Sequence, residues 1–384
     1  MSPRSGTDQE FEGIRTFRRA DVIKSRQIIQ RSINGTKYSK DQPWYIIIDN
    51  KVYDIKEFVP DHPGGAPILT HIGKDATGNH VTKVHIITHD LLANYYVGDI
   101  TYEDIISPKG SSKLKVQFTK LGYFKSSKIF YLYKSISTII LWFISVMILK
   151  SFGNSLPGVL AAAAVMALFW QQCGWISHDY LHHQVFENRC YNDWVGCFFG
   201  AVCQGFDPCW WKNKHNTHHA APNVHGQDPD IDTHPILSWS EHALTDLFDP
   251  EFAREHANAY PQWLTRIMVN NQTINYFPIL ALARLSWCAQ SILYILPNGQ
   301  TGSIGDARMP VTLLEQISIC GLLLALCFSL NHNGMKVLNE EETMKTDFYV
   351  EQVITGRDVT ANSLMGCWFV EWFTGGLNFQ IEHH

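Results

Sequence analysis

The amino-acid sequence predicts a chain of two parts, a small soluble domain with β-strands followed by an all-α domain that crosses a membrane several times. Three observations lead to this expectation. A strand-like apolar run, Trp44 to Ile48, lies in the polar N-terminal region. Two long apolar stretches come later, and the 18 histidines gather in clusters separated by apolar, His-free segments. Such clustering indicates sites rather than background usage.

Composition excludes several classes of protein. The 384 residues carry a net charge of −5, so a nucleic-acid-binding surface is not expected. The nine cysteines include no CxxC pair, which argues against a disulfide framework or a cysteine zinc site and indicates a reducing compartment. Residues 1–16 form a polar tail without the apolar core of a secretory signal, so we expect the N-terminus in the cytosol.

The predicted soluble domain covers residues 17–102. A turn at Asp49 to Lys51 is expected to connect two strands. The loop Asp61-His62-Pro63-Gly64-Gly65, followed by His85, offers two imidazoles, and its proline and glycines let the backbone turn tightly beside a porphyrin. Two axial histidines close a haem iron to substrates, so such a haem transfers electrons. His80 and His89 lie near His85 and remain alternatives for the second ligand.

Residues 103–128 are predicted to be a linker, and residues 129–384 the membrane domain. A membrane span needs about 20 apolar residues. Ile129 to Leu149 and Leu156 to Ile176 both qualify, and the short link between them predicts a helical hairpin. Lys134, near the start of the first span, would extend its long side chain to the membrane surface.

Two further spans are weaker candidates. Phe277 to Leu296 contains Arg284. Ile317 to Leu330 is only 14 residues long, which by itself favours a re-entrant or buried helix. If both cross the membrane, the histidines before and after them lie on the same side.

Three histidine boxes accompany these spans. Residues at positions i, i+3 and i+4 of a helix share one face, so each box offers two or three side chains to one metal region. The boxes are His178, His182 and His183; His215, His218 and His219; and Gln380, His383 and His384. Imidazole suits Fe, Zn and Cu, and this many donors is enough for two metal ions. Five nearby carboxylates are candidates for orienting the imidazoles: Asp179, Asp228, Asp230, Asp232 and Glu382.

The first part of the chain resembles cytochrome b5. The residues that carry the resemblance are Trp44, Asp49 to Ile55, Asp61 to Gly65, Gly73 to Thr77 and Asn94 to Ile100. The resemblance implies a small α+β fold that binds haem b through His62 and His85.

The second part resembles the membrane-bound fatty-acyl desaturases, whose three histidine boxes hold a non-haem di-iron centre. A fused cytochrome b5 domain, with Gln380 replacing the first histidine of the third box, is typical of front-end desaturases. These insert a double bond between an existing one and the carboxyl end. Stretches similar to fungal delta-6 acyl desaturases are Gln204 to Phe206, Trp210 to Lys212, His215 to Pro222, Asp228 to Pro235, Asn331 to Met335 and Trp372 to Asn378. By similarity, His332 supplies a further iron ligand.

The resemblance also implies an activity. Two non-haem irons, O2 and electrons from NADH would remove two hydrogens from adjacent methylenes of a linoleoyl or alpha-linolenoyl chain, carried on a lipid or on CoA. An unactivated methylene has no acidic proton, so acid–base catalysis alone cannot do this. The expected partners are NADH-cytochrome b5 reductase and the lipid bilayer. The expected location is the endoplasmic reticulum membrane, multi-pass, with the haem domain and the boxes facing the cytosol.

Alternatives to the delta-6 assignment remain. A delta-5 acyl or delta-8 sphingolipid desaturase has the same boxes, whereas a fatty-acid hydroxylase needs a different box order and no Gln380. Because the family continues beyond the third box and this sequence ends at His384, we expect the desaturase domain to be incomplete at its C-terminus. The rival from another class is an inactive fragment that acts only as a membrane-tethered electron carrier.

Overall fold

The chain forms two compact units in a computed structural model. The structure describes residues 15–33, 42–62, 66–77, 92–101, 117–231, 233, 236–248, 262–298 and 330–383. The first unit comprises Met1–Leu121 with Glu340–Val350, and the second comprises Gly122–Asn339 with Glu351–His384.

The first unit is built on a four-stranded sheet of order β1-β4-β3-β2. Its strands are β1 (Thr16–Phe17), β2 (Tyr45–Ile48), β3 (Lys51–Asp54) and β4 (Tyr96–Ile100), and its helices are α1 (Arg19–Ile33), η1 (Val59–Asp61), η2 (Ala66–His71), η4 (Ala93–Tyr95) and α15 (Glu340–Lys345). The predicted turn is confirmed, since Asp49 and Asn50 have φ of 50° and 62°, the left-handed values that a two-residue hairpin needs.

The core of the first unit lies beside this sheet. Ile46, Ile55, Phe58 and Ile72 are almost fully buried and pack into one cluster. His62 follows η1, and its ring lies edge-on to Phe58 with 5.5 Å between ring centroids. The α+β character expected of this part of the chain is therefore confirmed, and one predicted haem ligand lies at the edge of its core.

The second unit is helical in its described residues, apart from loops and an isolated bridge between Val224 and Leu338. Its helices are α5 (Lys128–Phe152), α6 (Leu156–Leu181), α7 (Arg189–Cys197), η6 (Phe198–Gln204), α8 (Pro208–Ala220), α9 (Glu241–Phe248), α11 (Gln262–Asn270), α12 (Gln272–Leu280), α13 (Ala283–Asn298), α16 (Phe348–Thr355), α17 (Leu364–Thr374) and α18 (Gln380–His383). α16 begins in the first unit and ends in the second.

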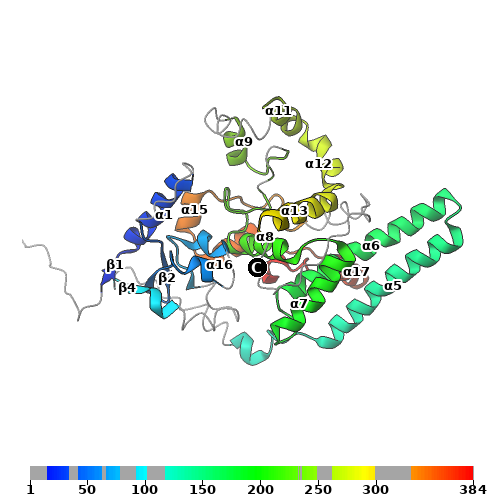
Figure 1. Cartoon of the computed structure of the whole chain (residues 1–384), viewed down its shortest axis with the longest axis horizontal. Coiled ribbons are helices and arrows are strands. Elements are labelled where there is room, and N and C mark those ends of the chain that lie inside the picture. Colours follow the sequence, from blue (N-terminus) through cyan, green and yellow to red (C-terminus); the bar gives the residue numbers. More distant parts are fainter. Residues whose placement is uncertain are drawn as a thin grey trace, which may run out of the picture. The chain divides into compact units, whose positions relative to one another are not determined.

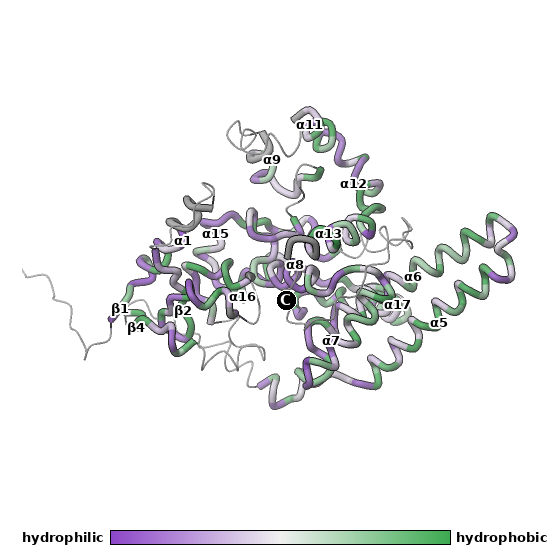
Figure 2. The backbone as a smooth tube through the Cα atoms, viewed as in Figure 1, coloured by the Kyte–Doolittle hydropathy of each residue, from purple (hydrophilic) through white to green (hydrophobic). Residues whose placement is uncertain are grey.

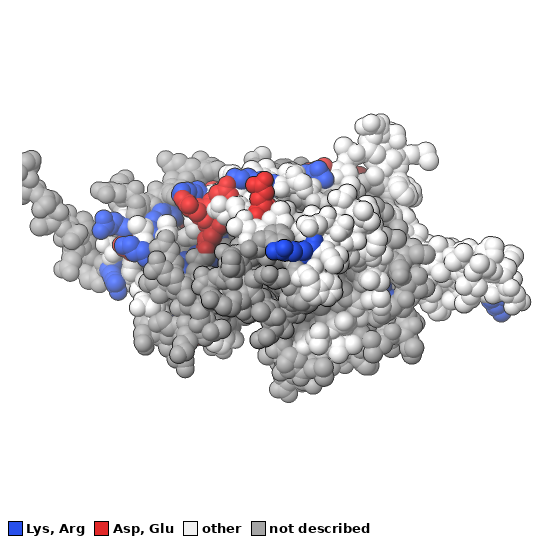
Figure 3. All heavy atoms as spheres, turned by 90° about the horizontal axis from the view of Figure 1, so that it is seen from above, with Lys and Arg blue, Asp and Glu red and all other residues white. Residues whose placement is uncertain are grey.

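The predicted helical hairpin is confirmed as α5 and α6, which run side by side (Figure 1). Ser127 and Ser155 cap the two helices by accepting N–H groups of Phe130 and Gly158. Hydrophobic residues recur along the length of both helices (Figure 2). The hairpin, at the right of Figure 3, shows few charged side chains. Both helices are long and apolar enough to cross a membrane, by length and composition.

Two predictions about the spans are wrong. The stretch Phe277 to Leu296 is not one helix, because it is divided between α12, which contains Pro278, and α13. Lys134 does not extend to the surface, since it is 4% exposed and donates to the carbonyl of Trp372. The predicted fourth span lies outside the described residues except for Leu330.

Candidate metal centre

Five histidines converge in the second unit. Side-chain nitrogens of His178, His182, His215, His219 and His383 all lie within 4.8 Å of one another, and we call these residues the histidine cluster. His215 Nε2 is 3.0 Å from both His178 Nε2 and His219 Nε2. The structure thus brings members of all three predicted boxes to one place.

Local helix geometry explains this convergence. His178 lies in the last turn of α6, and His182, four residues later, is the C-cap of the same helix, with 4.5 Å between the two ring centroids. His215 and His219 have the same spacing on α8, and their ring centroids are 4.6 Å apart. Asp207 starts α8 by accepting the N–H of Trp210. The predicted faces shared by His178 with His182 and by His215 with His219 are confirmed.

The chemistry of the cluster fits a metal ion that prefers imidazole, such as iron. His182 Nε2 is buried and has no hydrogen-bond partner among the described residues. An unsatisfied buried polar atom costs about 1–3 kcal/mol, which a bound metal would offset. Asp179 Oδ1 lies 2.9 Å from His178 Nδ1 and turns the Nε2 atom inward, while Tyr131 donates its hydroxyl to Asp179 Oδ2. Metal-binding histidines are typically oriented by a carboxylate in this way.

A second set of residues adjoins the histidine cluster. It consists of His218, Asp228, Asp230, His332 and Gln380, and we call it the acidic group. His218 Nδ1 lies 3.0 Å from both oxygens of Asp228, and the rings of His218 and His332 are 4.7 Å apart. Gln380 Nε2 lies 2.8 Å from His332 Nε2, and Asn331 donates to Gln380 Oε1. His332 Nδ1 faces the carbonyl of Thr355 at 2.9 Å.

Burial and charge give His218 a protonation state that differs from that of three rings in the histidine cluster. Burial, reinforced by neighbouring imidazoles, lowers the pKa of His182, His215 and His383 well below the usual range, so these rings are neutral, as metal ligands must be. Burial alone would also lower the pKa of His218. Its charge interactions with Asp228 and Asp230 outweigh that effect and raise the pKa of His218 to about 9. Burial lowers the pKa of His332 to about 4.

The third histidine of the first box lies outside both sets. His183 has a left-handed φ of 58°, which turns its side chain away from the face shared by His178 and His182. Its Nε2 lies 2.8 Å from Asp193 Oδ1 and 3.1 Å from the ammonium of Lys212. Lys212 also pairs with Asp193 at 2.7 Å. The box motif predicted His183 as a metal ligand, but the structure places it in a separate ionic group.

Two other predicted ligands, His85 and His384, lie outside the described residues, as does Asp232. Sequence reasoning missed Tyr131 and Asn331, which hold Asp179 and Gln380. The sequence did contain a signal for Tyr131. It lies three residues before Lys134, so the two polar side chains share one face of an otherwise apolar helix. Asn331 directly precedes the predicted ligand His332, and this adjacency could have marked it as part of the site.

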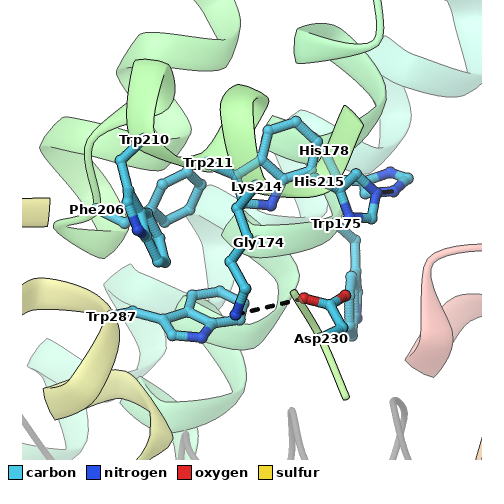
Figure 4. A pocket seen from close by; sticks show the side chains of 10 residues that line it. All are labelled: Gly174, Trp175, His178, Phe206, Trp210, Trp211, Lys214, His215, Asp230 and Trp287. Atoms are coloured by element: carbon cyan, nitrogen blue, oxygen red, sulfur yellow. Dashed lines mark hydrogen bonds and ion pairs between the residues drawn. The ribbon is translucent and has the colours of Figure 1, made fainter. Parts of the chain in front are cut away.

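An aromatic pocket opens beside His178 and His215 (Figure 4). Its other lining residues are Gly174, Trp175, Phe206, Trp210, Trp211, Lys214, Asp230 and Trp287. The ammonium of Lys214 pairs with Asp230 at 3.3 Å across the pocket. The remaining wall is largely indole and phenyl surface, which suits an apolar ligand.

Comparison with known proteins identifies a family for each part of the chain. The cytochrome b5-like heme/steroid binding domain matches residues 35–101, and the fatty acid desaturase family matches residues 154–384. An acyl-lipid (9-3)-desaturase from Physcomitrium patens is 35% identical over 375 residues, which cover 90% of this chain and 67% of that protein.

Two further relatives come from other organisms. The Delta(6)-fatty-acid desaturase fat-3 of Caenorhabditis elegans is 27% identical, with 93% of this chain and 87% of that protein covered. A Delta(8)-fatty-acid desaturase of Euglena gracilis is 29% identical, with 87% and 82% covered. These matches span both parts of the sequence, and the chain belongs to the fatty acid desaturase family, with a cytochrome b5-like domain at its N-terminal side.

Proposed function

We propose that this oxidoreductase is a front-end delta-6 acyl desaturase acting on polyunsaturated chains such as linoleoyl and alpha-linolenoyl. The observation that carries the proposal is the histidine cluster with the acidic group beside it, because two adjoining sets of imidazoles suit two iron ions. The b5-like domain and the desaturase family imply haem and a di-iron centre. The similar delta(6) desaturase of Caenorhabditis elegans supports the regiochemistry.

The ligands follow from the two sets. The histidine cluster would hold one iron, and His218, His332 and Gln380 would hold the other, with His384 as a further proposed ligand. When bound, the irons supply the redox chemistry with O2 that removes hydrogen from an unactivated methylene. Asp179 and Asp228 hold the Nδ1 atoms of His178 and His218, which directs each Nε2 away from the carboxylate. His218 would lose its Nε2 proton when iron binds.

The aromatic pocket is the proposed binding site of the acyl chain. Trp175, Trp211 and Trp287 offer apolar surface next to His178 and His215 (Figure 4), where a methylene must lie to react. The same side chains exclude water from that position. We further propose His62 and His85 as haem ligands, NADH-cytochrome b5 reductase as the electron donor, and the endoplasmic reticulum membrane as the location, with the haem domain and boxes facing the cytosol.

The test is a fatty-acid profile. The 384-residue chain is expressed in a yeast that lacks the activity and is fed linoleate, and the methyl esters are analysed. A triene with a new double bond at carbon 6 is the expected product. A bond at carbon 5 would replace the delta-6 assignment by a delta-5 desaturase. A new double bond in the long-chain bases of the sphingolipids, analysed alongside the methyl esters, would replace it by a delta-8 sphingolipid desaturase. No product from a protein whose haem absorbs normally would contradict the proposal and favour an electron carrier.

A further inference from the structure

Lys134 is a buried charge inside the α5–α6 hairpin. Its side chain is 4% exposed, although most of α5 presents apolar residues outward. Its ammonium donates to the carbonyl of Trp372 at 3.0 Å, lies 3.5 Å from Gln172 Oε1, and stands 5.7 Å from the centre of the Trp372 ring. Charged residues inside membrane spans are costly and usually mark a functional interaction.

Three side chains of α6 reach the same point as Lys134. Gln171 Nε2 donates to the carbonyl of Phe373 at 2.5 Å, and Trp175 Nε1 donates to the same carbonyl at 3.0 Å. Gln172 Nε2 donates to the carbonyls of Trp372 and Phe373, each at 3.2 Å. Trp372 and Phe373 lie in the last turn of α17, whose carbonyls have no partner inside the helix. A cation is also favoured at this end by the helix dipole. We call Lys134, Gln171, Gln172 and Trp175 together the polar anchor.

The chain between the polar anchor and the third box is tightly held. Gly375 has a left-handed φ of 69°, and a Cβ there would approach Trp175 Cβ to 2.4 Å, so only glycine fits against the anchor. Thr374 donates its hydroxyl to Asn378 Oδ1, and Asn378 Nδ2 donates to the carbonyl of Val359. The next helix, α18, starts at Gln380 and carries His383. The position of the α17 end therefore determines where the third box begins.

We propose that Lys134 is a positioning residue of the desaturase, which with Gln171, Gln172 and Trp175 fixes the end of α17 so that the third box reaches the metal centre. This inference rests on the proposed function, because it requires His383 to be an iron ligand. Although the described residues of α5 include no histidine, this proposal gives α5 a direct part in assembling the site.

The first experiment measures iron retention in the purified full chain with haem and iron bound. Lys134→Met keeps the length of the side chain and removes its charge and donors. We expect iron to pass to a ferrous chelator at least about 10-fold faster than from the unmodified protein, the scale on which supporting residues affect metal sites. Lys134→Gln keeps one donor and should be intermediate. Ser145→Ala is the matched control, because Ser145 bonds the carbonyl of Ala162 in the same hairpin, and it should change the rate less than about 2-fold.

A double-mutant cycle with His383→Ala separates positioning from general destabilisation. If Lys134 acts through the third box, adding Lys134→Met to His383→Ala should give no further increase in iron release. Additive effects would overturn the inference, and so would iron retention by Lys134→Met equal to that of Ser145→Ala. Full iron retention by His383→Ala would refute the proposed ligand set itself, whereas iron loss in His383→Ala without loss in Lys134→Met would refute only the role of Lys134.

Discussion

His215 of the histidine cluster and His218 of the acidic group are both histidines, but they are held in opposite charge states. His215 and His218 belong to one box and lie on one helix, and their rings stack with 5.6 Å between centroids. The pKa of His215 is held well below its usual range by burial and by other imidazoles. The pKa of His218 is raised to about 9, because Asp228 and Asp230 outweigh the effect of burial.

This difference shows that the box motif specifies position but not protonation. In the histidine cluster, His182, His215 and His383 are neutral and need no change to accept a metal ion. In the acidic group, Asp228 holds the Nδ1 atom of His218, and this ring must lose its Nε2 proton before it can bind a metal ion. Variants that remove a cluster ring, a carboxylate or the nearby His183 should therefore have effects of very different size.

The largest effect is expected from His215→Ala. His215 Nε2 lies 3.0 Å from Nε2 of both His178 and His219, so its loss opens the middle of the histidine cluster. We expect product formation in the yeast assay to fall by more than about 100-fold, since even residues that only orient a ligand cost about 10–100-fold. Iron per haem should fall in parallel.

His225→Ala provides the control for that variant. His225 follows the second box, and its ring stacks on His242 with 5.8 Å between ring centroids. Its iron content should equal that of the unmodified protein. Equal iron loss in the two variants would show that general destabilisation, rather than ligand removal, accounts for His215→Ala.

A smaller effect is expected from Asp228→Asn. Asp228 is fully buried and also accepts the N–H groups of Asn223 and Asp230, so it holds both the His218 ring and the loop that follows α8. Iron affinity should fall about 10–100-fold, as measured by chelator competition. Asp179→Asn tests the corresponding carboxylate of the histidine cluster. The loss of iron affinity in Asp179→Asn should be smaller, because Asp179 orients only His178 and the cluster keeps four other rings. A larger loss for Asp179→Asn would reverse the comparison.

The charge difference also predicts a dependence on pH in the metal-free protein. The pKa of His218 in the folded chain, about 9, exceeds its ordinary value of 6.5. The ion pair therefore stabilises the fold fully below pH 6.5, and this contribution is lost as the pH rises through 9. The charged and titratable groups acting on His218 include Asp228, Asp230 and Lys214, and His332 packs against its ring. The melting temperature should fall over this range, and Asp228→Asn should flatten the fall. Parallel curves would contradict the assignment.

Sequence reasoning located the boxes well and their surroundings poorly. The helical spacing of His178 with His182, and of His215 with His219, predicted shared faces that the structure confirms. The inward turn of Lys134 was not predicted, because its partner, the carbonyl of Trp372, lies 238 residues away in sequence. Asp228 was only one of several candidate carboxylates, since a loop has no periodicity from which direction can be inferred. Local spacing determines faces within a helix, whereas contacts between distant segments depend on tertiary packing.

The smallest effect is expected from His183→Gln, although His183 lies beside His182 in the same box. Its backbone is left-handed, and its ring joins Asp193 and Lys212 rather than the histidine cluster. A glutamine can keep one hydrogen bond to Asp193, so we expect unchanged iron per haem and a loss of stability of about 1 kcal/mol. His182→Gln is the matched variant, because it removes a buried nitrogen from the cluster, and it should lose iron. Equal iron loss in both variants would mean that His183 turns toward the metal in the loaded protein, and the first box would then supply three ligands instead of two.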